Sequence, residues 1–100
     1  MNREPLFFEN SQGKERVIAE VCDMEDAFKE MHDFCTERNF RIYYTNYYIE
    51  ECPAEAGSGY ETAWRITFDV GSWSEFFHIY FDTFDQAERF RNTADFEKPF

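Results

Sequence analysis

The chain has 100 residues, and its 10 Lys and Arg against 21 Asp and Glu give a formal net charge of −11 at pH 7. This negative charge repels phosphate backbones and anionic lipids, which argues against direct binding to nucleic acid or to a membrane surface. Aromatic residues make up 21% of the chain and supply apolar material for a core. We therefore expect one domain over residues 1–100, with a tail at 93–100 that is either loose or anchored by Phe96 and Phe100.

The cysteines and the N-terminal residues bear on location. Cys22, Cys35 and Cys52 are an odd number of thiols and contain no C-x-x-C pair, which is typical of a reduced intracellular protein. Residues 1–8 lack the apolar segment of a signal peptide, and no apolar run approaches the roughly 18 residues of a membrane span. We predict a cytoplasmic location, in a host cell if the gene belongs to a phage or mobile element.

The N-terminal segment has the pattern of a β-hairpin. Residues 6–9 and 16–21 have strand-like composition and are separated by a polar, glycine-containing turn. In the second strand Val17, Ala19 and Val21 alternate with other residues. Because alternate side chains of a strand share a face, we expect these three to face the core.

A helix is predicted next, and it has the clearest periodicity in the chain. Asp23 is a favourable N-cap, and apolar residues follow at spacings of three and four. Asn39 suits the left-handed position that often ends a helix. The predicted apolar residues are Met24, Ala27, Phe28, Met31, Phe34 and Cys35.

Three further strands are predicted in the middle of the chain. Residues 40–50 are rich in Tyr and Ile, with a bulge expected near Thr45 and Asn46 where the alternation changes. Residues 60–70 alternate regularly, which predicts one buried and one wet face. Residues 76–81 predict a fifth strand. Its buried side chains should be Phe77, Ile79 and Phe81.

A short second helix completes the pattern. Thr83 and Gln86 have the spacing of a capping box, and the helix should extend to about Asn92. Its apolar stripe is Phe84, Ala87 and Phe90. The order β-β-α-β-β-β-α predicts an α+β fold: a mainly antiparallel sheet of about five strands with two helices packed on one face.

Signatures of catalysis and metal binding are weak. The two histidines are His32 and His78, no serine lies in a G-x-S-x-G motif, and the cysteines have no readable Cys/His signature. His78 and Asp82 share a strand face but lie about 13 Å apart by strand rise, too far for one ion. We expect His78 to be solvated or packed against neighbouring strands. The prediction is a protein without catalytic residues, metal or cofactor.

The remaining candidate is a surface of aromatic and acidic side chains. We expect the aromatic residues to lie on the sheet face away from the helices, where Tyr and Trp favour an interface and acids steer a basic partner. The alternative is a second core layer beneath the hairpin or a dimer partner. The aromatic candidates are Tyr43, Tyr47, Trp73, Phe76 and Tyr80. The acidic candidates are Glu50, Glu51, Glu55, Glu61, Glu75 and Asp82.

These observations favour a small acidic protein-interaction module that engages a basic protein surface. In its sharpest form it mimics the charge of nucleic acid and inhibits a nuclease or another nucleic-acid-binding protein, as small acidic inhibitors of phages and mobile elements do. The alternative is a structural or assembly protein that forms a homodimer through the aromatic sheet face, with no inhibitory role. A small-molecule or metal-dependent enzyme is the third alternative.

Overall fold

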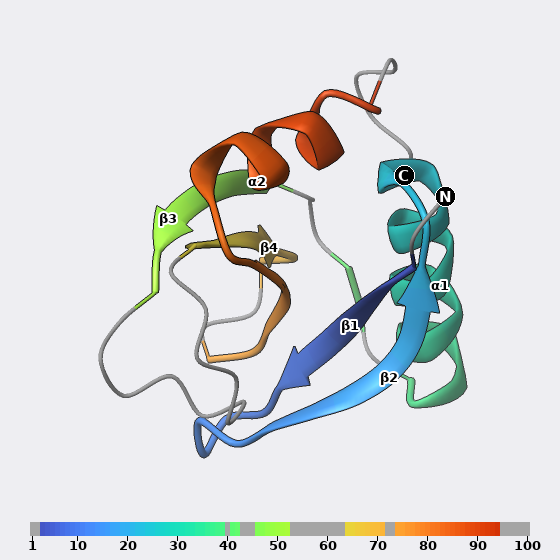
Figure 1. Ribbon diagram of the computed structural model, residues 1–100. Helices are drawn as coiled ribbons and strands as arrows, with labels where there is room; N and C mark the ends of the chain where they lie inside the picture. The colour runs from blue at the N-terminus through green and yellow to red at the C-terminus, as the bar shows by residue number, and fades with distance from the viewer. Residues whose placement is uncertain (1–2, 40, 43–45, 53–63, 72–73, 95–100) are drawn as a thin grey trace.

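The computed structural model describes residues 3–39, 41–42, 46–52, 64–71 and 74–94. Within this part of the chain the order is β1-β2-α1-β3-β4-β5-α2, which confirms the predicted α+β fold (Figure 1). The elements are β1 Glu4–Glu9, β2 Glu15–Val21, α1 Met24–Glu37, β3 Asn46–Glu51, β4 Trp64–Asp69, β5 Phe76–Phe81 and α2 Phe84–Arg91. Neither helix is long and apolar enough to cross a membrane.

The five strands form one antiparallel sheet in the order β2-β1-β5-β4-β3. β1 lies between its hairpin partner β2 and the last strand β5. Because of this order, α1 connects the two edges of the sheet, and residues from the two ends of the chain become neighbours. Glu9 and His78, for example, are 69 positions apart in sequence and in hydrogen-bonding contact.

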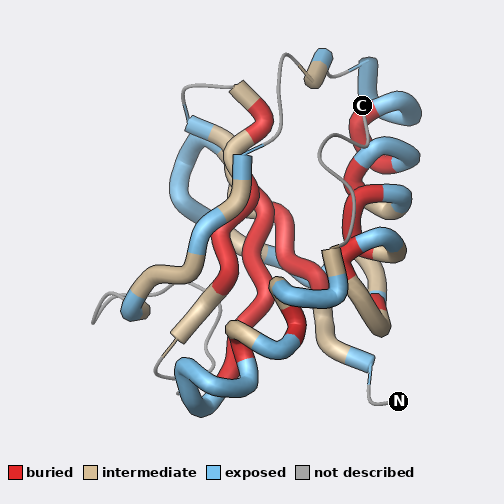
Figure 2. The backbone as a smooth tube through the Cα atoms, turned by 90° about the horizontal axis from the view of Figure 1, so that it is seen from above, coloured by how far each residue is buried: buried red, intermediate tan, exposed pale blue. Residues whose placement is uncertain are grey.

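Both helices pack against the same face of the sheet and share its hydrophobic core. Figure 2 shows the buried side of α1 turned toward the buried strands and its exposed side turned away. The six predicted apolar residues of α1 are all buried, which confirms its periodicity. The sheet contributes Leu6, Phe8, Val21, Ile66, Phe68, Phe77, Ile79 and Phe81 to this core. The prediction that Phe77, Ile79 and Phe81 of β5 enter the core is confirmed, although His78 and Tyr80 on the other face are buried as well.

The helix ends also follow the sequence signals. The Asp23 side chain accepts a hydrogen bond from the Asp26 N–H at 2.8 Å, and Asn39 adopts a left-handed φ of 57°. In α2, Thr83 and Gln86 form the predicted capping box. Thr93 then joins the helices, because its hydroxyl accepts from the Met24 N–H at 2.9 Å. The start of α1 is thereby tied to the residues that follow α2.

One expectation for β2 was wrong. Leu6 pairs with Ala19 but Phe7 pairs with Val17, so Ile18 is an extra residue in β2. This bulge reverses the alternation between Val17 and Ala19. Ala19 packs against the core, whereas Val17 lies on the other face and is 47% exposed.

Several of the predicted element boundaries fall on residues that the structure does not describe. The residues beyond Ala94, residues 60–63 and Thr45 lie outside the described part of the chain. Phe84 belongs to the predicted stripe of α2 but is 40% exposed, with its ring edge against Trp64. Cys22, Cys35 and Cys52 form no disulfide bond with one another.

Candidate functional site

The candidate site lies on the sheet face opposite the helices, which we call the polar face. Strand alternation places here the side chains that do not enter the core. Thr67 lies opposite His78, and Arg65 lies opposite both Tyr80 and Glu50. The residues of the site are Glu9, Glu15, Glu50, Arg65, Thr67, His78 and Tyr80, which come from all five strands.

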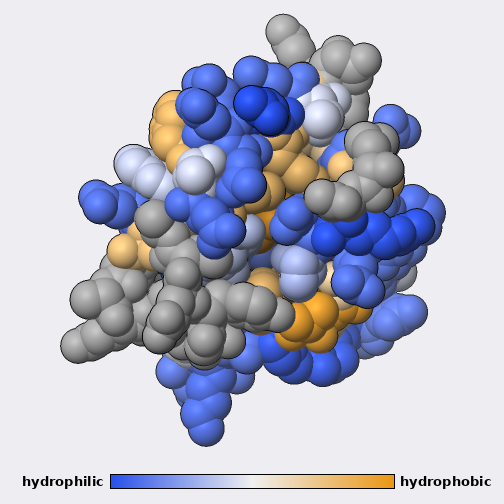
Figure 3. All heavy atoms as spheres, viewed as in Figure 1, coloured by the Kyte–Doolittle hydropathy of each residue, from blue (hydrophilic) through white to orange (hydrophobic). Residues whose placement is uncertain are grey.

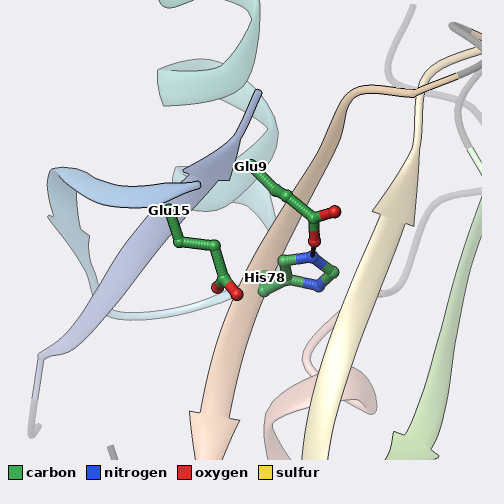
Figure 4. Close-up of side chains that lie close together, drawn as sticks. All are labelled: Glu9, Glu15 and His78. Carbon is green, nitrogen blue, oxygen red and sulfur yellow. Dashed lines mark hydrogen bonds and ion pairs between the residues drawn. The ribbon is translucent and has the colours of Figure 1, made fainter. Parts of the chain in front are cut away.

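His78 is the centre of the site and is only 1% exposed. Its Nδ1 lies 2.9 Å from the Thr67 hydroxyl oxygen, and its Nε2 lies 2.7 Å from Glu9 Oε1. The rings of Phe76 and Tyr80 lie beside it along β5. Figure 4 shows Glu9 of the neighbouring strand β1 and Glu15 of the next strand, β2, near His78. The expectation that His78 packs between strands is confirmed, but both of its ring nitrogens have polar contacts.

A second set of contacts extends this arrangement across the sheet. The Thr67 hydroxyl donates to Glu50 Oε2 at 2.7 Å, and Arg65 Nε donates to the same oxygen at 2.6 Å. Arg65 Nη1 also donates to the Tyr80 hydroxyl at 3.4 Å, and that hydroxyl donates to Glu15 Oε1. Continuous hydrogen bonds therefore connect Glu9 on β1 to Glu15 on β2 through the centre of the sheet.

The network has fewer donor protons than its hydrogen-bonding contacts require. The contacts Glu50–Thr67, Thr67–His78 and His78–Glu9 each require one proton. The Thr67 hydroxyl carries one proton and a neutral imidazole carries one, while ionised carboxylates only accept. The charged Glu50 is the stronger acceptor for the Thr67 hydroxyl, so the one proton of a neutral His78 serves either Thr67 from Nδ1 or Glu9 from Nε2. With that proton on Nδ1, His78 Nε2 and Glu9 Oε1 are two acceptors facing each other, and this contact needs an additional proton or another cation.

Burial opposes charge on both members of that contact. Burial, with a further contribution from the nearby Arg65 charge, lowers the pKa of His78 to about 4 against the opposing effects of Glu15 and Glu50. Burial also raises the pKa of Glu9, which Arg65 lowers and Glu50 raises. His78 is therefore neutral at pH 7.

Glu9, Glu15 and His78 together form a set of potential metal ligands. One ligand atom from each lies within 4.8 Å of the others. Spacing along the chain pointed to His78 with Asp82 and gave no sign of this set, because its members come from β1, β2 and β5. The adjacency of β1 and β5 was the missing information, and no local spacing signals it.

The aromatic candidates do not form one surface. Tyr47 pairs with Phe68 and packs on the helix side, with its ring centroid 5.6 Å from that of Phe28. Tyr80 lies on the opposite face and is only 6% exposed. The expectation that both share one face was wrong, because β3 has the opposite alternation from the one assumed. Tyr48 is instead the residue of β3 that lies on the polar face, and it is 39% exposed.

The remaining candidates are scattered. Glu50 belongs to the network on the polar face, Glu51 and Asp82 are exposed, and Glu75 and Phe76 are half-buried. The candidates outside the described residues are Tyr43, Glu55, Glu61 and Trp73. The structure therefore places only part of the predicted partner-binding set on one surface.

Comparisons with known proteins add no assignment. No family model matches the chain, and no curated protein or solved structure matches it either. The function must therefore be argued from the residues themselves.

Proposed function

We propose that this chain is a small acidic protein-interaction module that binds a basic surface of another protein through the polar face. The observation that carries the proposal is the charge of this face. Among the described strand residues of this face, one guanidinium, Arg65, is accompanied by five carboxylates. These carboxylates are Glu9, Glu15, Glu20, Glu50 and Asp69.

Tyr48 is the aromatic residue that would contact such a partner. Burial raises the pKa of its hydroxyl, the charges of Glu50 and Asp69 raise it further, and Arg65 has the opposite effect. The ring therefore lies among carboxylates while 39% of the residue stays exposed. Exposed tyrosines next to charged groups are frequent hot spots in protein interfaces.

The partner's chemistry follows from this charge. Arginine and lysine side chains would pair with the carboxylates, and the net charge of −11 would accelerate their approach. The side chains of Glu9 and Glu50 remain 23% and 32% exposed, so a partner can reach them. Figure 3 shows a mostly hydrophilic surface in that view, with hydrophobic side chains gathered in small areas. A basic groove that normally binds nucleic acid is the sharpest form of this partner, and inhibition of that protein would be the outcome.

Self-association through the polar face is the competing proposal. It would place carboxylates of one copy against those of another, and like charges in an interface are unfavourable by several kcal/mol. The predicted aromatic dimer face also loses support, because Tyr47 and Tyr80 lie on opposite faces. We therefore favour a basic partner over a second copy.

The test uses two variants of the polar face and one control. Tyr48→Ala removes the exposed ring, Asp69→Asn removes one charge, and Glu25→Gln removes the same charge from the exposed side of α1. Each immobilised protein is exposed to lysate of the native host at low and moderate salt, and bound proteins are identified by mass spectrometry. Each identified partner is then purified, and its affinity is measured for all variants.

We expect the captured partners to be basic proteins that dissociate as salt screens the charges. Their affinity should fall at least about tenfold for Tyr48→Ala and clearly for Asp69→Asn, and it should not change for Glu25→Gln. Displacement of DNA or RNA from such a partner would support the mimic form. Partners that bind all three variants equally would contradict the proposal. A dimer detected by light scattering and dissociated by Tyr48→Ala would favour the assembly alternative.

A further inference from the structure

We propose that Glu9, Glu15 and His78 form a binding site for one divalent transition-metal ion, with Zn²⁺ as the best-suited ion. This inference shares Glu9 and Glu15 with the face proposed to bind a partner, but it concerns their contacts with the buried His78 and is tested without any partner. It rests on three features: the donor set, the orientation of the imidazole and the close contact between His78 and Glu9.

The donor set consists of one imidazole nitrogen and two carboxylate oxygens. Zn²⁺ commonly binds this combination, and Mn²⁺ and Fe²⁺ also accept it. Ca²⁺ and Mg²⁺ prefer oxygen ligands alone, so the nitrogen of His78 disfavours them. Three protein ligands also leave a coordination position for water, as in open zinc sites.

The imidazole is held in the orientation that a metal ligand requires. His78 Nδ1 contacts the Thr67 hydroxyl at 2.9 Å, and Thr67 contacts Glu50 at 2.7 Å. A metal-ligating histidine usually donates its other ring N–H to an oxygen that is itself held by hydrogen bonds. Thr67 and Glu50 provide this support, which directs the lone pair of Nε2 toward Glu9. Glu15 is similarly oriented by the hydroxyl of Tyr80.

The contact between His78 Nε2 and Glu9 Oε1 is the position that a cation would fill. When the neutral imidazole carries its proton on Nδ1, as Thr67 allows, Nε2 and the ionised carboxylate are both acceptors, and they lie 2.7 Å apart. A metal ion supplies the missing positive charge. On binding, a proton held in this contact passes to solvent, and both atoms donate their lone pairs to the ion.

The geometry needs only side-chain adjustment. Ligand atoms around a tetrahedral zinc at about 2.05 Å from the ion lie about 3.3 Å apart. Binding would therefore widen the 2.7 Å contact between Glu9 and His78 and draw Glu15 inward from within 4.8 Å. His78 is fixed in β5, whereas both glutamates have long side chains that can rotate. The charge of Arg65 opposes a cation at His78, and its ion pair with Glu50 at 2.6 Å offsets part of this repulsion.

The test is titration of the purified chain with ZnCl₂ alone, after removal of metal by EDTA and dialysis, followed by calorimetry. The ligand variants are Glu9→Gln and Glu15→Gln, which keep an oxygen acceptor and similar volume. The matched control is Glu20→Gln, an exposed position of the same strand as Glu15. Thr67→Val tests the support of His78 without changing a ligand.

We expect one Zn²⁺ per chain, with affinity at least tenfold weaker in both ligand variants and unchanged in Glu20→Gln. Thr67→Val should weaken binding by about 10- to 100-fold, the usual effect of losing a partner of a ligating histidine. Nitrogen NMR of the wild-type ring should show Zn²⁺ at Nε2 and the proton at Nδ1. MgCl₂ should not compete at equal concentration.

Two results would overturn the proposal. The first is the absence of stoichiometric Zn²⁺ binding at 0.1 mM-scale concentrations, roughly the weak end of protein metal sites. The second is binding that persists equally in Glu9→Gln and Glu15→Gln, which would place the ion elsewhere, for instance at Cys22 or His32. Because circular dichroism and unfolding curves are recorded for every variant, loss of the fold is distinguished from loss of the site.

Discussion

Replacing Thr67 by Val tests the polar network most directly. Val has nearly the same shape and suits a strand, but it lacks the hydroxyl that joins Glu50 to His78. Thr67 is only 2% exposed, so water does not readily replace the lost partner. Loss of a hydrogen bond to a charged acceptor costs about 1.5–3 kcal/mol, and a buried unsatisfied donor at His78 adds a comparable amount. We therefore expect about 3 kcal/mol less stability.

The assay is equilibrium unfolding in urea, followed by circular dichroism in metal-free buffer with EDTA. A domain of this kind has about 5–15 kcal/mol of stability, so the variant should still fold. Thr36→Val, at an exposed position of α1, is the control and should change the free energy of unfolding by no more than about 0.5 kcal/mol. A loss at Thr67 no larger than in the control would show that these hydrogen bonds do not form and would also refute the orientation assigned to His78.

Two other predictions concern pH and the helices. The pKa of His78 is about 4 in the folded chain and 6.5 in the unfolded one. The contribution of neutral His78 to the free energy of unfolding is therefore complete above pH 6.5 and is lost as the pH falls toward 4. From pH 7 to 5 this should remove about 2 kcal/mol in urea unfolding with EDTA, and a pH dependence equally steep in His78→Gln would contradict it. Thr93→Val removes the acceptor of the Met24 N–H and should cost about 1 kcal/mol by thermal unfolding. If it proves as neutral as Thr36→Val, the link between the helices contributes nothing.

The candidate site was only partly accessible to sequence reasoning. Phe76, His78 and Tyr80 were correctly separated from the side of β5 that faces the helices, because alternation is a local property, but the burial of His78 and Tyr80 was not predicted. The partners of His78 were not found, since Glu9 and Thr67 reach it only through the pairing of β5 with β1 and β4. Pairing between distant strands leaves no spacing in the sequence.

The same distinction holds for surfaces. Acidity and aromatic content were evident from composition, but the face on which each side chain lies depends on register. A single extra residue in β2 moved Val17 away from the core, and the opposite alternation of β3 exchanged Tyr47 for Tyr48 on the polar face. Composition therefore indicates the type of partner, and register determines which residues would meet it.

Local signals specified the elements of this protein. Helix periodicity, the caps at Asp23 and Thr83 and the alternation in β5 depend on residues within one or two turns or a few strand positions, so the linear order is sufficient. The strand order, the bulge and the cluster of Glu9, Glu15 and His78 were decided by tertiary packing. The physical reason is that hydrogen bonding between strands joins segments far apart in the chain, and burial of one common core selects which strands become neighbours.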